Sequence, residues 1–204
     1  GDASVDYSAF TVIVLEGDSS TSSPTPPGII DDVFIVGTTD VSGYWTTGFM
    51  SNGLENGTQT VLLVEGFTGA AGDDLDTDDD GVLDATPWSR VVDNVAVNDG
   101  GASDMTYAAV VLTASFDGGT FSVGGASRIP DSTDTDSVTD WVRNDFDGEG
   151  FSGFSGTPVD GEAVNTPGAV NVAATTPPPP APSDPLINEF VFNHAGTDTN
   201  EFIE

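Results

Sequence analysis

The feature that most constrains the fold is a strand-like segment that a proline tract holds apart from the rest of the chain. Residues 177–182 read Pro-Pro-Pro-Pro-Ala-Pro. Such a tract is a stiff, extended spacer, and it cannot join a sheet interior because proline has no backbone N–H to donate. The residues beyond it, Leu186–Glu204, are called here the C-terminal segment, and they are expected to stand off from the body of the chain.

The C-terminal segment contains two short apolar stretches with the character of β-strands. Phe190 and Phe192 lie two residues apart, so the period of a strand places both rings on one face. A lone pair of strands is marginal in water, so these strands need an acceptor. The residues expected to make that contact are Ile187, Phe190, Val191, Phe192, Phe202 and Ile203.

The chain is strongly acidic. It holds 34 Asp and Glu against three arginines and no lysine, which gives a formal net charge of −31 over 204 residues. Such self-repulsion destabilises a compact state unless cations condense on the surface or bind at defined sites. A halophilic or merely solubilising surface is the alternative, and it can coexist with metal sites. Direct binding of nucleic acid is disfavoured, because it requires a basic patch.

Two absences limit the class of protein further. The sequence contains no cysteine, so disulfides cannot cross-link the fold and metal ions are left for that role. It contains no run of eighteen apolar residues, so membrane insertion is not expected. We expect an extracellular or cell-surface location.

Short runs of β-branched and aromatic residues recur between clusters of Gly, Asp and Pro. Their spacing predicts an all-β fold, an antiparallel β-sandwich. Only Ser137–Arg143 is compatible with a helical turn, with Asp136 as its N-cap. The predicted strands are Phe10–Glu16, Val33–Val36, Thr60–Glu65, Val91–Val97, Tyr107–Thr113, Phe121–Val123 and Ile187–Phe192, and Trp45, Trp88 and Trp141 are expected to be core or edge-covering aromatics.

The strongest chemical motif is the acidic loop Asp76–Asp84. Carboxylates at relative positions one, three, five and nine, with Gly81 at position six for the sharp turn, are typical of a calcium loop. An EF-hand has Glu at position twelve, where this chain has Pro87, so the motif is an EF-hand-like loop between strands. The predicted ligands are Asp76, Asp78, Asp80, Val82 and Asp84, completed by Asp73, Asp74 or another loop. A solvated acidic turn is the alternative.

A second acidic cluster comprises Asp131, Asp134, Asp136 and Asp140. Two interpretations remain open for it. It is either a second calcium site or a set of capping and turn aspartates around Trp141, with Arg143 as the local counter-charge.

Catalytic constellations are missing from the sequence. His194 is its one histidine, and there is no Cys or Lys, so Cys–His pairs and sites of several imidazoles are excluded. No glycine-rich phosphate loop of the GxxxxGK[ST] type occurs. We expect this chain not to be an enzyme.

Several stretches carry a resemblance to a known family. INEFVFN at 187–193 and DTNEFIE at 198–204 resemble the opening strands of a lamin-tail domain. YSAFTVIV at 7–14 resembles the stretch that comes after those opening strands in the family, and NTPGAVN at 165–171 resembles the closing turn. LENGT at 54–58 and GASRIP at 125–130 are similar to stretches of bacterial secreted proteins with this module, some of them extracellular nucleases. The resemblance implies an immunoglobulin-like β-sandwich, although a fold does not fix a function.

The order of these parts differs from the family, because the opening strands come last. A body without its first strands would hold an open groove, and a neighbour's Leu186–Glu204 would complete it by strand addition next to Phe10–Glu16. Because donor and acceptor are different surfaces, this contact would propagate head to tail. Two alternatives remain open: one period of a tandem array, and self-insertion, which the rigid prolines disfavour.

We therefore expect three parts: a β-sandwich body at 1–172, a Pro-rich spacer at 173–185 and a donor strand segment at 186–204. The expected function is that of a calcium-stabilised extracellular structural protein that assembles head to tail with identical subunits or adjacent repeats. The alternatives are an accessory lamin-tail-like module of a secreted nuclease or hydrolase, and a cell-surface adhesin module.

Overall fold

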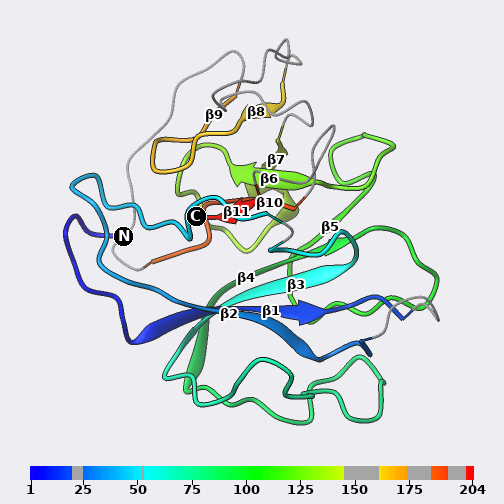
Figure 1. Cartoon of the computed structure of the whole chain (residues 1–204). Helices are drawn as coiled ribbons and strands as arrows, with labels where there is room; N and C mark the ends of the chain where they lie inside the picture. The colour runs from blue at the N-terminus through cyan, green and yellow to red at the C-terminus, as the bar shows by residue number, and fades with distance from the viewer. Residues whose placement is uncertain (20–24, 52, 145–160, 174–184, 193–200) are drawn as a thin grey trace. The chain divides into compact units, whose positions relative to one another are not determined.

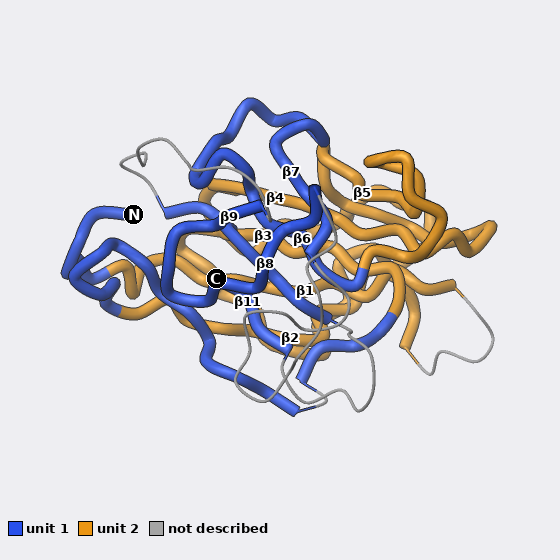
Figure 2. Tube along the Cα trace, turned by 90° about the horizontal axis from the view of Figure 1, so that it is seen from above, with its two compact units in different colours: residues 1–6, 38–56, 124–204 blue, residues 7–37, 57–123 orange. Residues whose placement is uncertain are grey.

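The chain folds into β-strands with a single short helical turn among its described residues (Figure 1). This computed structural model describes residues 1–19, 25–51, 53–144, 161–173, 185–192 and 201–204. They form two compact units, which are treated separately below (Figure 2). Unit 1 comprises Gly1–Asp6, Thr38–Asn56 and Gly124–Glu204, and unit 2 comprises Tyr7–Gly37 and Gly57–Val123. The predicted all-β class with antiparallel sheets is confirmed, while its immunoglobulin-like form stays a prediction.

Unit 2 is built on a five-stranded sheet with the order β2-β1-β3-β4-β5. Its pairs are antiparallel except β4 with β5, which run parallel. The strands are β1 (Phe10–Glu16), β2 (Ile30–Ile35), β3 (Gln59–Glu65), β4 (Arg90–Asn98) and β5 (Val111–Thr113). The two central strands β1 and β3 are apolar along nearly their whole length, as expected of strands buried on both faces.

One face of this sheet carries a hydrophobic core cluster. Ile13 lies opposite Leu62 in the register of β1 with β3, and both side chains are buried. Leu15, Ile30, Val64 and Leu75 complete the buried cluster, and Trp88 and Tyr107 pack against it. Trp88 is thus a core-covering aromatic, as the sequence predicts.

Unit 1 contains a four-stranded antiparallel sheet with the order β11-β10-β6-β7. Its strands are β6 (Gly125–Arg128), β7 (Trp141–Arg143), β10 (Glu189–Val191) and β11 (Phe202–Ile203). A separate pair joins β8 (Ala163–Val164) to β9 (Val172–Ala173). The single 3₁₀ turn, η1 (Val138–Asp140), directly precedes β7.

The C-terminal segment lies in the sheet of its own chain. Strand β10 pairs with β6, and β11 pairs with β10 (Figure 1). Self-insertion, one of the alternatives left open by the sequence, is therefore the arrangement that the structure shows. The expected position next to Phe10–Glu16 is wrong, because β1 already has β2 on one side and β3 on the other. The spacer residues 174–184 and His194 lie outside the described residues.

The C-terminal segment is buried within its own chain. The six residues predicted to contact an acceptor are each at most 2% exposed: Ile187, Phe190, Val191, Phe192, Phe202 and Ile203. Phe190 and Phe192 share one face, with ring centroids 4.8 Å apart, and Trp141 lies 5.9 Å from Phe190. Burial of such a side chain stabilises the fold by about 1.5–3 kcal/mol. The segment is therefore part of the core of unit 1.

Several predicted boundaries are wrong. Phe121–Val123 is not a strand, and Phe121 is exposed. The strand in this region is β6, which begins two residues after Val123. Only the last three residues of Tyr107–Thr113 form a strand, β5, and β2 begins at Ile30 rather than Val33. The helical turn is η1, and its N-cap is Ser137 rather than Asp136.

Gly125 offers a direct test of the contact between β6 and β10. A Cβ at this position would lie 2.5 Å from the backbone oxygen of Phe190, closer than any stable contact. We expect Gly125→Ala to loosen β10 and Gly125→Val to displace it, because strand backbones cannot separate without losing their hydrogen bonds. Hydrogen exchange should accelerate at residues 189–191 and remain unchanged in β1 and β3, which are the internal control. Equal protection of β10 in Gly125→Val and wild type would contradict the pairing.

Candidate functional site

The predicted metal loop folds around a buried carboxylate. Asp76 is fully buried, and its Oδ1 accepts the backbone N–H of Asp80 at 3.1 Å. Its Oδ2 accepts the N–H of Gly81 and the hydroxyl of Tyr107, each at 2.8 Å. Gly81 has a φ of +84°, the left-handed conformation that the sequence motif requires. The glycine at position six and the first aspartate thus occupy the places expected in a calcium loop.

Three carboxylates of the loop come together. Asp76, Asp78 and Asp84 each offer an oxygen, and these atoms lie within 4.8 Å of one another. Asp78 is exposed, and the negative charge of Asp80, followed by those of Asp84 and Asp76, raises its pKa. The carboxylate of Asp84 is oriented by the backbone N–H of Thr77, which donates to its Oδ2 at 2.9 Å. This group of oxygens suits a hard cation.

The other predicted ligands of the loop have local roles in the structure. Asp80 accepts the N–H of Val82 at 2.9 Å, and the Val82 side chain is exposed. Asp74 accepts the N–H of Asp76 at 3.1 Å, and Asp73 accepts the N–H of Ala70 at 2.7 Å. Of the seven predicted ligands, three are close enough to share an ion as the loop stands, and ligation by the others stays a prediction.

The second acidic cluster supports turns and an arginine. Asp140 accepts the N–H of Thr135 at 2.7 Å and forms a capping box with Ser137 at η1. Asp134 pairs with Arg128 at 3.1 Å, and Asp140 lies 3.7 Å from the same guanidinium. Arg128 is 1% exposed and stacks on Trp141 at 4.5 Å. The capping alternative accounts for these contacts, with Arg128 as a counter-charge where Arg143 is expected from the sequence; a metal at Asp131, Asp134, Asp136 and Asp140 stays a prediction.

A buried polar network surrounds the carboxylate of Glu189 in unit 1. Glu189 is completely buried, and it accepts hydrogen bonds from the Asn144 amide and from the backbone N–H of Thr166. Asn144 also donates to Asn165 at 2.6 Å and accepts from Ser127 at 2.7 Å. Burial raises the pKa of Glu189 to about 7. The network therefore joins β10 to the segment at 165–171.

A second part of the network surrounds Asn188. Its Nδ2 donates to Asp131 Oδ1 at 3.1 Å and to Glu204 Oε1 at 3.2 Å. Asn171 completes the contact, since its N–H donates to Asp131 at 2.8 Å and its Nδ2 donates to the Asn188 backbone oxygen at 2.9 Å. Burial, followed by the charge of Glu189, raises the pKa of Glu204 to about 8. Sequence patterns did not single out these asparagines, because buried amides have no characteristic spacing.

Unit 2 contains a further acidic cluster that the sequence analysis did not identify. Asp18, Asp99 and Asp104 approach one another within 4.8 Å around Thr58. The Thr58 hydroxyl lies 2.8 Å from Asp104 and 3.2 Å from Asp99, and the Thr58 N–H donates to Asp18 at 2.9 Å. Burial raises the pKa of Asp99. Asp99 and Asp104 lie in one loop, but Asp18 is far from them in sequence, so no local motif could have indicated the whole cluster.

We expect calcium at Asp76–Asp84 to stabilise the chain. A ligand at about 100 times its Kd adds about 2.7 kcal/mol, so a chelator should lower the Tm by roughly 5–10 °C at equal ionic strength. Asp78→Asn should reproduce the loss, since it removes an exposed ligand without disturbing the buried Asp76. Asp79→Asn is the matched control, because Asn tolerates the φ of +52° at that position. Absence of a calorimetric calcium signal together with an unchanged Tm would exclude the site.

We expect the C-terminal segment to be held more tightly at low pH. Folding raises the pKa of Glu189 to about 7 and of Glu204 to about 8, above the ordinary value of 4.5. The folded state therefore binds more protons, and this contribution to stability is complete below pH 4.5 and is lost as the pH rises through 7 to 8.

Hydrogen exchange of residues 189–191 between pH 5 and pH 9, corrected for intrinsic exchange rates, measures this loss. Glu189→Gln should weaken the pH dependence, because the side chain can no longer ionise. Glu65→Gln, which changes an exposed carboxylate in unit 2, is the control. A Glu189→Gln variant with the wild-type pH dependence would show that this carboxyl is not responsible.

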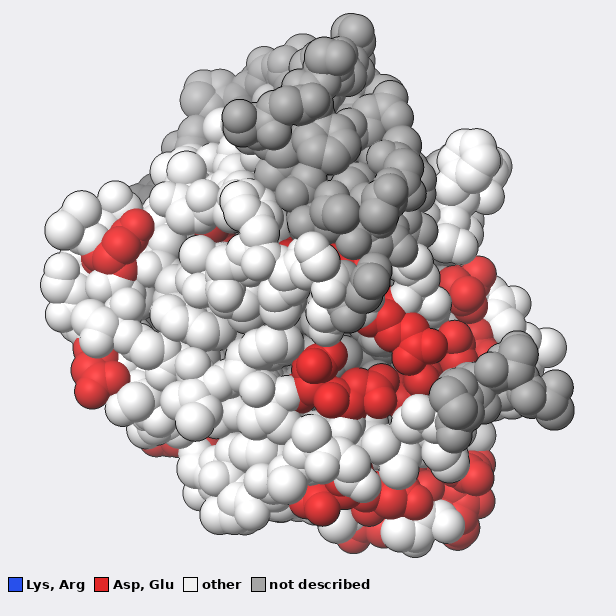
Figure 3. Space-filling view, in the orientation of Figure 1, with Lys and Arg blue, Asp and Glu red and all other residues white. Residues whose placement is uncertain are grey.

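Asp and Glu side chains form patches on the face drawn in Figure 3. Among the described residues, no helix has the length and apolar character needed to cross a membrane. No protein-family model, no curated protein and no solved structure matches this chain.

Proposed function

We propose that this chain is an extracellular structural module, stabilised by calcium at the Asp76–Asp84 loop, that joins identical copies head to tail by exchanging its C-terminal segment. The observation that carries the proposal is the position of β10, which is a central strand of the unit 1 sheet although a proline-rich spacer separates it in sequence from the body. Exchange of an identical element between copies preserves every contact and is a low-cost route to assembly.

The contacts of β10 favour a segment that docks into a groove of the body. Strand β6 pairs with β10 over three residues and with β7 on its other side. The Arg128 Nε donates to the Ile187 oxygen at 3.0 Å, and the Asn171 amide donates to the Asn188 oxygen at 2.9 Å. These donors belong to the body, so a neighbour's segment would find the same partners. Backbone pairing would supply affinity, and the buried side chains would supply specificity.

Backbone groups of the body also hold Glu201, the residue directly before β11. The Met50 N–H donates to the Glu201 oxygen at 3.0 Å, and the Glu201 carboxylate accepts the N–H groups of Gly53 at 2.7 Å and Leu54 at 2.9 Å. Glu201 is 1% exposed, so its charge is satisfied by backbone donors rather than by water. A groove with such donors is specific for a strand that carries this glutamate.

An accessory module of a secreted nuclease or hydrolase is the second candidate. It is favoured by the completion of the β11-β10-β6-β7 sheet within one chain, which a module acting alone also requires. In this case the chain would stay monomeric and the chemistry would belong to another domain. In neither case does the chain itself carry catalysis.

Assembly before and after removal of Leu186–Glu204 distinguishes the two candidates. Light scattering coupled to size exclusion, with negative-stain microscopy, should show concentration-dependent oligomers or fibres of the full chain. The shortened chain should not polymerise. The synthetic peptide 186–204 should bind to the shortened chain, and the same peptide with Phe190→Asp and Phe192→Asp is the control. A full chain that stays monomeric at every concentration would overturn head-to-tail joining and support the accessory module.

A further inference from the structure

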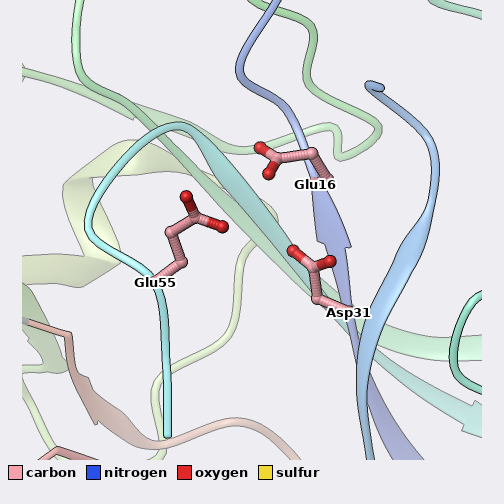
Figure 4. Close-up of side chains that lie close together, drawn as sticks. All are labelled: Glu16, Asp31 and Glu55. Atoms are coloured by element: carbon pink, nitrogen blue, oxygen red, sulfur yellow. The ribbon is translucent and has the colours of Figure 1, made fainter. Parts of the chain in front are cut away.

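A pair of acidic side chains lies on adjacent strands at one end of the unit 2 sheet. Glu16 ends β1, and Asp31 lies in β2; each offers a carboxylate oxygen within 4.8 Å of the other (Figure 4). The register places Val14 opposite Asp32 and Leu15 opposite Ile30, so Asp31 is the extra residue of a β-bulge. Bulges redirect a side chain, and here the Asp31 carboxylate points toward Glu16 (Figure 4).

The Glu16 carboxylate is buried and held in place. It is 1% exposed, and its Oε1 accepts the N–H of Gly17 at 2.8 Å and that of Asp18 at 2.7 Å. These two donors fix the direction of the carboxylate, as outer hydrogen bonds do for the ligands of metal sites. They do not supply a full positive charge to a site that holds two carboxylates.

A buried amide without hydrogen bonds lies on the same face of the sheet. Gln59 begins β3 directly opposite Glu16, and directly opposite residues in an antiparallel pair project from one face at close range. Gln59 is 1% exposed, and neither its Oε1 nor its Nε2 has a hydrogen-bond partner among the described residues. A buried polar group in this state lowers stability unless a ligand satisfies it.

Unit 2 has no nearby basic side chain to neutralise the pair. Arg90 is the only Arg or Lys in the sequence of unit 2, and its Nε pairs with Glu65 at 2.7 Å. Glu65 lies opposite Phe10 at the start of β1, whereas Glu16 lies at its end. Six residue steps of about 3.3 Å separate these ends by roughly 20 Å. Arg90 is therefore too distant to compensate Glu16 and Asp31.

We propose that Glu16, Asp31 and Gln59 bind a divalent cation of the hard, oxygen-preferring class, with calcium as the ion that best fits. Two carboxylates would neutralise its charge, and the Gln59 carbonyl would supply a neutral oxygen ligand. Calcium accepts six to eight oxygens in flexible geometry, whereas magnesium requires a near-ideal octahedron, so a bulged sheet edge suits calcium better. The site shares no ligand with Asp76–Asp84, and its existence does not depend on that loop.

Calorimetry with Ca²⁺ on full-length chains that carry Asp78→Asn tests the proposal with the loop site removed. In this background we expect to detect a site whose affinity falls about tenfold or more with Asp31→Asn or with Gln59→Leu. Asp32→Asn is the matched control, since it removes the same charge from the next residue of β2. Equal Ca²⁺ binding by the Asp31→Asn and Asp32→Asn variants would overturn the proposal.

Stability measurements on Gln59→Leu give a second test that does not depend on the loop. Without metal, leucine removes a buried amide that lacks partners, so the variant should melt at a higher temperature than wild type. With saturating Ca²⁺ the wild type should melt at the higher temperature, because only the wild type has the amide ligand. If Gln59→Leu melts above wild type by the same margin in Ca²⁺ and in chelator, Gln59 is not a ligand.

Anomalous diffraction from Tb³⁺-soaked crystals should show a peak between Glu16 and Asp31, and its absence would contradict the site.

Discussion

Carboxylates in the interior of a chain with three arginines are the constraint on which the rest of this structure depends. Asp76, Glu189 and Glu201 are each at most 1% exposed, as is Glu16 at the end of β1. A buried charge is strongly destabilising unless donors, a counter-charge or a proton compensate it. Each of these carboxylates accepts at least two hydrogen bonds, most of them from backbone N–H groups, so the backbone rather than basic side chains solves most of the problem.

The two units compensate the charge of their remaining carboxylates in different ways. Unit 1 contains Arg128, which serves Asp134 and Asp140, and it surrounds Glu189 and Glu204 with amides and raises their pKa values. Protons are therefore available to these carboxyls near neutral pH. Unit 2 places its carboxylates in groups of oxygens close enough to share an ion, as at Asp76, Asp78 and Asp84. Acid would thus favour the first arrangement, and a bound cation would favour the second.

The sequence predicts the parts of the fold that have a strong apolar period. Strand β1 matches its predicted range at both ends. Strand β3 begins one residue earlier than predicted, and β4 extends one residue beyond its predicted range at each end, because long apolar runs between turn residues have few other solutions. Strand β6 is not predicted, because it reads Gly-Ala-Ser-Arg and contains no β-branched residue; its hydrogen-bonded partners are β10 and β7. Its glycine is required by the close approach of Phe190, a tertiary reason that no local pattern contains.

The candidate sites also differ in whether a local sequence pattern can reveal them. The spacing of the Asp76–Asp84 loop and its glycine are local, so the sequence indicates them, and the structure brings three of the acidic residues together. The proximity of the Glu16 and Asp31 carboxylates depends on a bulge. The hydrogen bond of Asn188 to Asp131 joins positions 57 residues apart in the chain. Sites made by long-range packing need the fold before they can be recognised.

The polar network also explains how β10 keeps a single register. Along β10, Phe190 faces Trp141 while Glu189 on the opposite face meets Asn144, so the strand is buried on both sides with different chemistry. A slip of one residue would place a carboxylate among aromatic rings and a phenyl ring among amides. Both errors leave polar groups unsatisfied, which costs more than the loss of a few apolar contacts. The same chemistry that holds this strand in its register therefore disfavours strands of other sequence.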